Sequence, residues 1–123
     1  MLSVSSIHLD SFQIEVSEER NSLSLRLSGT GDMAAVEPLK ECLGQVRNDM
    51  ARLGLKRTDI DIRALYLLNS SCIKAFVRFI YSMQTDGPQF PLRFVVDGKL
   101  SWQARALSAF TRMAPDLVTV EAV

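Results

Sequence analysis

The sequence predicts one α/β domain, with a mainly parallel mixed β-sheet covered by about three helices. The chain has 123 residues, of which 47% are hydrophobic, as is typical of a single globular domain. Apolar residues alternate in some segments and recur every three or four positions in others, which gives the order β-β-α-β-α-β-α-β. Strand–helix–strand units cross over in the right-handed sense, which makes their strands parallel. We therefore assign residues 1–123 to a single domain.

The start of the chain predicts a β-hairpin. Residues 6–16 are expected to be extended, because apolar and polar residues alternate from position 12 to position 16. The acidic stretch 17–21 is interpreted as the turn. Alternating leucines then predict the second strand, and the glycine-containing segment 29–32 is interpreted as the loop that follows it.

A first helix is predicted from apolar residues that recur at steps of three and four between Val36 and Leu53. Proline is tolerated only in the first turn of a helix, so we expect this helix to begin just before Pro38. Gly54 is expected to end it, because glycine adopts the left-handed backbone conformation that closes many helices.

The middle of the chain predicts a strand followed directly by a second helix. Residues 59–62 alternate as in a strand, which is expected to run toward Leu68. Asn69 is a favourable N-cap residue, and the helix after it is predicted to extend to about Met83. The apolar face of this helix is broad, which indicates packing on more than one side.

The end of the chain predicts a buried strand, a third helix and a short last strand. Residues 92–96 form a nearly continuous apolar run, as expected inside a parallel sheet. Ser101 is expected to cap the third helix and Pro115 to terminate it. Residues 117–120 are predicted to form the last strand.

Charge and composition narrow the classes of partner. Fourteen basic residues balance fourteen acidic ones, so no overall field attracts nucleic acid. No stretch approaches the roughly 20 apolar residues of a membrane span, and the first residues do not have the pattern of a secretory signal. We expect a cytoplasmic protein without direct membrane insertion. Cys42 and Cys72 lack metal-type spacing and are expected to be reduced thiols that pack as small hydrophobic side chains.

Three segments are expected at the carboxyl ends of the strands, where α/β domains place their sites: 29–32, 69–71 and 97–99. None of them brings together a nucleophile, a base and an orienting group. Neither of the common phosphate-binding glycine motifs occurs in the chain. The single histidine, His8, is interpreted as a strand residue.

Asp32, Asp61 and Asp97 are in principle able to hold a divalent cation, as the carboxylates of a phospho-accepting aspartate site do. That chemistry requires an aspartate where the third strand ends, and Asn69 stands there instead. An amide cannot accept the phosphoryl group. We therefore predict no enzymatic activity, no cofactor and no metal.

The most informative segment is 67–73, where a predicted buried strand ends, a capping residue follows and two serines occupy the first helical turn. Local pattern alone favours the interpretation of Ser70 and Ser71 as ordinary first-turn residues. Electrostatics provides a second interpretation. A phosphate there would face unpaired backbone N–H groups and the positive end of the helix dipole. The helix would tolerate this charge, whereas a partner packed on that surface would not.

These residues resemble the STAS domain family, shared by sulfate transporters and bacterial anti-sigma factor antagonists. The resemblance covers most of the chain, from the strand at Leu23 to the strand ending near Val120. It includes Leu-Ser-Gly-x-x-Asp at 27–32. It continues with Asp61, followed eight residues later by Asn69-Ser70-Ser71, where the family usually has Asp-Ser-Ser-Gly or Asp-Ser-x-Gly.

The resemblance implies a non-enzymatic protein-binding domain in a partner-switching system that regulates transcription. In such proteins the unmodified domain binds an anti-sigma factor that is also a serine kinase. Phosphorylation of the serine after the aspartate breaks the complex, and a PP2C-type phosphatase restores it. By position, the acceptor here is Ser70, with Ser71 as its neighbour. Asp32 is expected to help form the docking surface together with Asn69, and Asp61 is expected to support it from a strand end.

Charge contacts with a docked partner are expected at Lys74 and Arg78, one turn apart on the second helix, which otherwise form an ordinary solvated stripe. Two residues depart from the family pattern. Asn69 removes a negative charge beside the acceptor, and Cys72 adds bulk where a glycine is usual and a partner would approach closely. We therefore expect a divergent member of the family.

Two other functions remain open. One is a constitutive STAS-type subunit of a transporter or another complex, without phosphorylation. The other is a small-ligand or nucleotide sensor that uses the helix start as an anion site.

Overall fold

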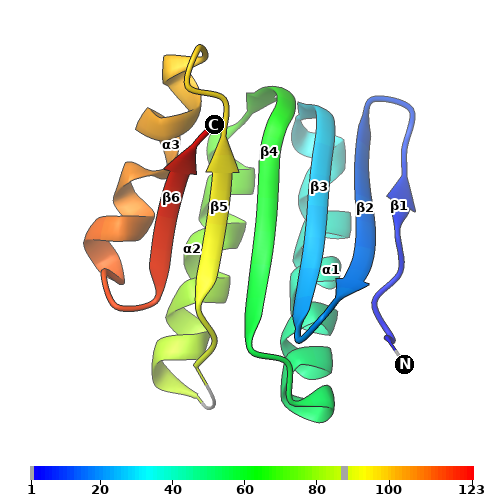
Figure 1. The fold of residues 1–123 in the computed structure, drawn as a ribbon. Helices are drawn as coiled ribbons and strands as arrows, with labels where there is room; N and C mark the ends of the chain where they lie inside the picture. The colour runs from blue at the N-terminus through cyan, green and yellow to red at the C-terminus, as the bar shows by residue number, and fades with distance from the viewer. Residues whose placement is uncertain (1, 87–88) are drawn as a thin grey trace.

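The computed structural model describes residues 2–86 and 89–123, and Figure 1 shows them as a layer of helices packed on a single six-stranded sheet. The described residues form these elements in chain order: β1 (Ile7–His8), β2 (Phe12–Glu19), β3 (Ser22–Gly31), α1 (Met33–Leu53), β4 (Arg57–Leu68), α2 (Ser70–Thr85), β5 (Leu92–Val96), α3 (Ser101–Met113) and β6 (Val118–Ala122).

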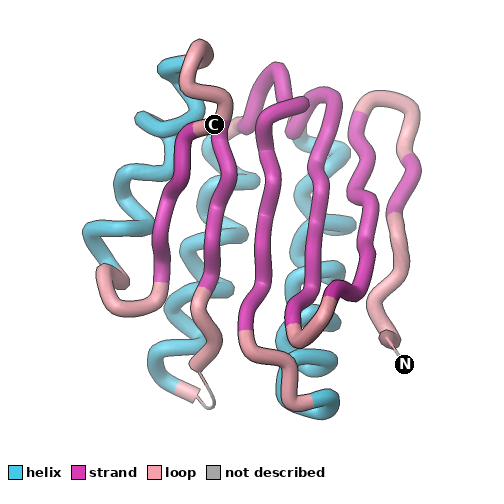
Figure 2. Tube along the Cα trace, viewed as in Figure 1, coloured by secondary structure: helices cyan, strands magenta, loops and turns pink. Residues whose placement is uncertain are grey.

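The strands lie in the sheet in the same order as in the chain, from β1 to β6. The first three strands pair antiparallel, and β3 to β6 pair parallel. From β3 to β6, each parallel strand is added next to the one before it, on the same side each time. Right-handed crossovers therefore bring the connecting helices to one face of the sheet. Figure 2 shows α1 and α2 behind the strands.

The core lies between the sheet and the helix layer. At its centre, three fully buried rings come from three different elements: Phe76 of α2, Phe94 of β5 and Phe110 of α3. Their centroids lie 5.4 to 5.8 Å apart in edge-on or tilted geometry. Aromatic pairs of this kind each contribute about 0.5–1.5 kcal/mol beyond the area that they bury. This cluster joins α3 to the same face of the sheet as α2.

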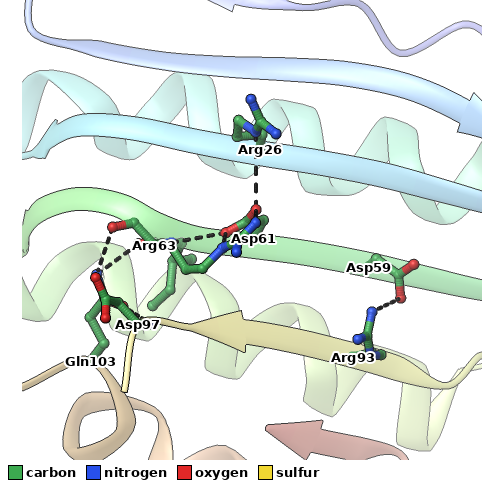
Figure 3. A network of polar contacts seen from close by, with 8 residues as sticks. Arg26, Asp59, Asp61, Arg63, Arg93, Asp97 and Gln103 are labelled. Atoms are coloured by element: carbon green, nitrogen blue, oxygen red, sulfur yellow. Dashed lines mark hydrogen bonds and ion pairs between the residues drawn. The ribbon is translucent and has the colours of Figure 1, made fainter. Parts of the chain in front are cut away.

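The opposite face of the sheet carries charged side chains, and no described helix covers it. Arg63 donates to Asp61 at 2.8 Å, and Arg93 lies 2.7 Å from Glu121. Arg26 reaches across from β3 to within 4.0 Å of Asp61 (Figure 3). Successive strand residues point to opposite faces, so the apolar positions fill the core and the charged positions between them face outward.

The predicted fold class is confirmed, and several local expectations change. An additional strand, β1, precedes the hairpin, because the backbone N–H of Leu9 donates to the carbonyl of Phe12 at 2.9 Å and turns the chain back. β3 continues to Gly31, so most of the segment interpreted as a loop is strand. Gly29 permits this with a φ of 91°, and a Cβ there would collide with the backbone oxygen of Ser11.

Two helix starts also differ from expectation. α1 begins at Met33 rather than just before Pro38, because the carboxylate of Asp32 accepts from the backbone N–H of Ala34 at 3.1 Å and caps the helix earlier. Ser101 is the first residue of α3 and does not cap it; Leu100 holds the cap position without a side-chain hydrogen bond.

The other predicted helix ends are confirmed, and the last strand is shifted. Gly54 ends α1 with a φ of 64°, and Asn69 caps α2. β6 spans Val118–Ala122, a residue or two later than the predicted 117–120.

The N-terminal segment is fastened to α1 by a buried carboxylate. Asp49 accepts from the backbone N–H groups of Ser3 and Val4, each at 2.8 Å, and from the Ser3 hydroxyl at 2.6 Å. Arg52, one turn further along α1, also donates to it at 2.8 Å. Burial by itself raises the pKa of Asp49, but these hydrogen bonds outweigh it and hold the pKa well below its usual range.

We expect Asp49→Asn to lower the free energy of unfolding by about 2 kcal/mol at pH 7, because an amide cannot accept these charge-assisted hydrogen bonds equally well. The folded pKa is lowered, so the carboxylate stabilises the protein above an unfolded value of about pH 4 and loses this effect as the pH falls. The difference between the two proteins should therefore shrink in urea unfolding at acidic pH. Asp10→Asn, at an exposed site, is the control. Equal losses in the two variants would refute the anchoring role.

Candidate functional site

The candidate site lies where β3 and β4 end side by side and each is followed directly by a helix. Gly31 pairs with Leu68, and the backbone N–H of Asn69 donates to the carbonyl of Gly31 at 2.8 Å. A Cβ at position 31 would lie 3.1 Å from the carbonyl oxygen of Leu67, so glycine favours this close approach of the two strands. The two residues that follow these strands, Asp32 and Asn69, are the N-caps of α1 and α2.

The start of α2 presents two serines to different degrees. The amide oxygen of Asn69 accepts from the backbone N–H of Cys72 at 2.8 Å, which fixes the first turn. Ser70 is exposed as the first helical residue, and Ser71 is half-buried beside it. The backbone N–H groups of a first helical turn have no partner within the helix and carry the positive end of its dipole. An added anion at Ser70 would therefore find a favourable backbone environment.

The side chain of Cys72 links the starts of the two helices on their buried side. Its side chain is fully buried, and its thiol donates to the carbonyl of Asp32 at 3.6 Å. The expectation that Cys72 adds bulk to the docking surface is therefore wrong, because the side chain points inward. Burial, assisted by the charge of Asp32, raises the pKa of Cys72, and burial with nearby Glu41 raises that of Cys42 to about 12. Both cysteines are free thiols and stay protonated at neutral pH.

Three large apolar side chains are exposed on the elements that meet at this edge. Tyr66 near the end of β4 is 82% exposed, its neighbour Leu67 is 48% exposed, and Met33 at the start of α1 is 68% exposed. We call these three residues the rim patch. Exposed apolar side chains on neighbouring elements are candidates for a protein-binding surface. The sequence suggested a buried strand end here. No local signal argued against it, because a continuous apolar run such as 65–68 is also expected inside a parallel sheet.

The rim patch is exposed because β4 is irregular beyond Asp61. Its pairing with β5 stops at Asp61, and its pairing with β3 shifts register twice between Asp61 and Leu67. Buried positions consequently fall at 60, 62, 65 and 68, rather than at every second residue. Tyr66 and Leu67 therefore both remain on the surface.

Beyond Asp61, the side chain of Gln103 in α3 forms hydrogen bonds with β4 in place of β5. Its amide nitrogen donates to the carbonyls of Ile62 at 2.8 Å and Leu65 at 3.2 Å. Its amide oxygen accepts from the backbone N–H of Asp97 at 2.8 Å (Figure 3). Gln103 is completely buried. A single side chain thus satisfies carbonyls of β4 and the N–H group that directly follows β5, as the burial of these polar groups requires.

The remaining predicted site residues lie in two places. Lys74 and Arg78 are exposed on α2 and line one groove together with Ser71. Contrary to the prediction, Asp61 does not lie at a strand end. It lies mid-strand on the open face of the sheet, because β4 continues for seven residues beyond it. Burial raises the pKa of the Asp61 carboxyl, but hydrogen bonds from Arg63 outweigh this and leave the pKa below its ordinary value.

The part of the chain that the structure describes contains neither a cluster of metal-ligating side chains nor a helix suited to span a membrane. Within it, no three His, Cys, Asp or Glu residues gather closely enough to hold a metal ion. Its helices include none that combines the length and apolar character needed to cross a membrane.

Comparison with known proteins supports the fold. The chain is similar to the crystal structure of an anti-sigma factor antagonist from Mycobacterium paratuberculosis, with a TM-score of 0.70 and 19% sequence identity. The similarity covers 93% of this chain and 88% of the other. Identity this low establishes the fold alone. No protein-family model matches the sequence, and no curated protein matches it significantly. The similarity to the solved structure confirms the STAS-like fold that the sequence indicated.

We expect Gln103→Leu to lower the free energy of unfolding by about 3 kcal/mol, because it leaves several buried backbone groups without partners. Hydrogen exchange should accelerate most at the amide of Asp97 and along residues 64–68. Gln84→Leu is a matched control, since Gln84 is exposed and makes one hydrogen bond to the carbonyl of Met113. A loss no larger than that of the control would contradict the role assigned to Gln103.

Asn69→Ala should cost about 1 kcal/mol through loss of the cap. Asn69→Asp should cost nothing, because a carboxylate accepts the same hydrogen bond and favours the positive helix end. Thermal unfolding of the three proteins measures this difference. Equal stability of the alanine variant and the unaltered protein would show that the cap contributes nothing.

Proposed function

We propose that this STAS-like domain is a regulatory protein-binding module. Its docking surface is formed by the rim patch and the start of α2, and phosphorylation of Ser70 controls its binding. The observation that carries the proposal is the placement of Ser70. The serine is exposed at the first position of α2, at the same edge of the fold as the exposed apolar residues Met33, Tyr66 and Leu67.

The physical basis of the switch is a difference between the free and the bound state. A phosphate adds about −1.5 to −2 charges, which water and the first-turn N–H groups accommodate in the free protein. In a complex, a partner packed on the rim patch would remove that water and leave the charge desolvated. Modification therefore weakens binding and leaves the fold intact. Ser70 suits this role better than the half-buried Ser71.

The resemblance supplies the class of partner. An anti-sigma factor that is also a serine kinase would bind the unmodified domain and then phosphorylate it, and a PP2C-type phosphatase would reverse the reaction. Asn69 carries no charge, so it does not oppose a phosphate on Ser70. The domain itself performs no catalysis in this scheme, and the process that it serves is regulation of transcription in the cytoplasm of a bacterium.

The expected result of Ser70→Asp is a loss of affinity of about 100-fold, equivalent to about 2.7 kcal/mol, for the cognate kinase-type anti-sigma factor. Calorimetry with the purified kinases of this class from the same genome measures it. Ser101→Asp is the matched control, because Ser101 is also exposed as the first residue of a helix. In parallel, mass spectrometry after incubation with kinase and ATP should find phosphate on the unaltered protein and on Ser71→Ala, and none on Ser70→Ala.

Two outcomes would decide against the switch. Unchanged phosphate incorporation into Ser70→Ala would remove Ser70 from the role. Tight binding that Ser70→Asp leaves unaltered would favour the constitutive subunit instead, a STAS-type domain held permanently in a larger complex.

A further inference from the structure

The groove between α1 and α2 has an apolar floor and basic walls. It consists of two adjoining hollows of about 230 and 180 Å³, which share Lys40, Ala75 and Arg78. Leu43, Ala75 and Phe79 form the floor. The groove extends along α2 from Ser71 to Ser82, which corresponds to about 16 Å of helix at 1.5 Å per residue.

The walls of this groove are positively charged on both sides. Lys40 and Arg47 line it from α1, and Lys74 and Arg78 line it from α2. Among the described residues that line the two hollows, none is an aspartate or a glutamate. The whole chain has a net charge of zero, so this excess of cations is local.

The charges of the groove are only partly neutralised by the protein itself. Lys40 lies 3.4 Å from Glu37 in an exposed pair, which contributes little. Arg47 donates to a backbone carbonyl, that of Asp86, at 2.8 Å. Among the described residues, Lys74 and Arg78 form no ion pair. Lys74 and Arg78 are therefore available to an anionic ligand, and Lys40 can exchange its exposed pair for such a ligand.

We propose that this groove binds an acidic amphipathic helix of the partner protein. An apolar floor between two basic walls matches a helix with one apolar stripe and carboxylates on both flanks. The length of the groove corresponds to about three turns of such a helix. Carboxylates on its flanks would pair with Lys40 and Arg47 on one side and with Lys74 and Arg78 on the other.

Other anionic partners fit the groove less well. Nucleic acid is held mainly by phosphate contacts, often with exposed aromatic residues that stack on bases, whereas the aromatic residue that lines this groove, Phe79, is buried. A membrane surface is flat and contacts protruding residues, whereas this site is recessed between two helices. We therefore treat both as outcomes of the test.

This inference deepens the proposed function, on which it rests for the identity of the partner. Ser71 lines one end of the groove, and Ser70 precedes it at the rim. A helix lying in the groove would thus reach the site where phosphorylation is proposed to act. Apolar contact with the rim patch and charge contact with the groove would then belong to one continuous interface.

The test uses a lactam-bridged helical peptide of about 11 residues, three helical turns, with leucines on one face and glutamates on both flanks. Saturable NMR shifts are expected at the amides of Gly44 and Ala75, which line the groove. The double variant Lys74→Glu/Arg78→Glu should weaken binding by about tenfold or more, and added salt should weaken it in the unaltered protein. A peptide with lysines in place of the glutamates should not bind.

The matched control is Arg20→Glu/Lys56→Glu, which makes the same change in net charge at exposed sites outside the groove. Its affinity for the peptide should stay within about twofold of the unaltered protein. Lys74→Gln/Arg78→Gln provides a milder version of the groove variant, and thermal unfolding verifies that each variant is folded.

Several results would overturn the inference. These are equal losses in the two charge-reversal variants, equal binding of the lysine peptide, or no shifts at the groove. Preferential binding of an oligonucleotide or of phosphatidylserine vesicles through Lys74 and Arg78 would assign the groove to a different class of ligand. Peptide binding does not depend on a kinase. Groove binding without phosphorylation of Ser70 would thus refute only the proposed switch, and phosphorylation without groove binding would refute only this inference.

Discussion

Beyond Asp61, β4 parts from β5, and the carbonyls of Ile62 and Leu65 are bound by the amide of Gln103 instead. An unpaired buried carbonyl costs about 1–3 kcal/mol, so this partner offsets the cost of the irregular path that β4 follows through the core. The path brings Asn69 beside Gly31 and leaves Tyr66 and Leu67 on the surface. One side chain from α3 thus supports the irregular part of β4 that carries Tyr66 and Leu67.

Charge is distributed very differently on the two faces of this neutral domain. On the open face of the sheet, arginines and acidic residues pair with one another, as Arg63 does with Asp61 and Arg93 with Glu121. Such a face presents little net field to a partner. In the groove between α1 and α2, the cations face one another across an apolar floor, with no acid between them. Net charge alone therefore conceals the surface that is best suited to an anionic protein segment.

The fold and the proposed function rest on different observations. The similarity to a solved anti-sigma factor antagonist concerns the path of the backbone at 19% identity, and one fold supports many functions. The proposed switch rests instead on an exposed hydroxyl at a capped helix start beside exposed apolar residues. The neutral Asn69 and the inward-pointing Cys72 leave that arrangement intact, because one still caps the helix and the other fills the core.

The order of elements from β2 onward, the hairpin, the asparagine cap and the position of Ser70 at the start of α2 were all predictable from the sequence, because they follow from local periodicity and from the chemistry of single residues. The rim patch, the mid-strand location of Asp61 and the early start of α1 were not. The rim patch and the location of Asp61 depend on where β4 separates from β5 and on the hydrogen bond that Gln103 makes to Ile62, 41 residues away in the chain. The early start of α1 depends on Asp32, which caps a helix that contains a proline. The groove likewise exists only once α1 and α2 lie side by side. Contacts between residues far apart in the chain leave no periodic signal, so only the tertiary structure decided these features.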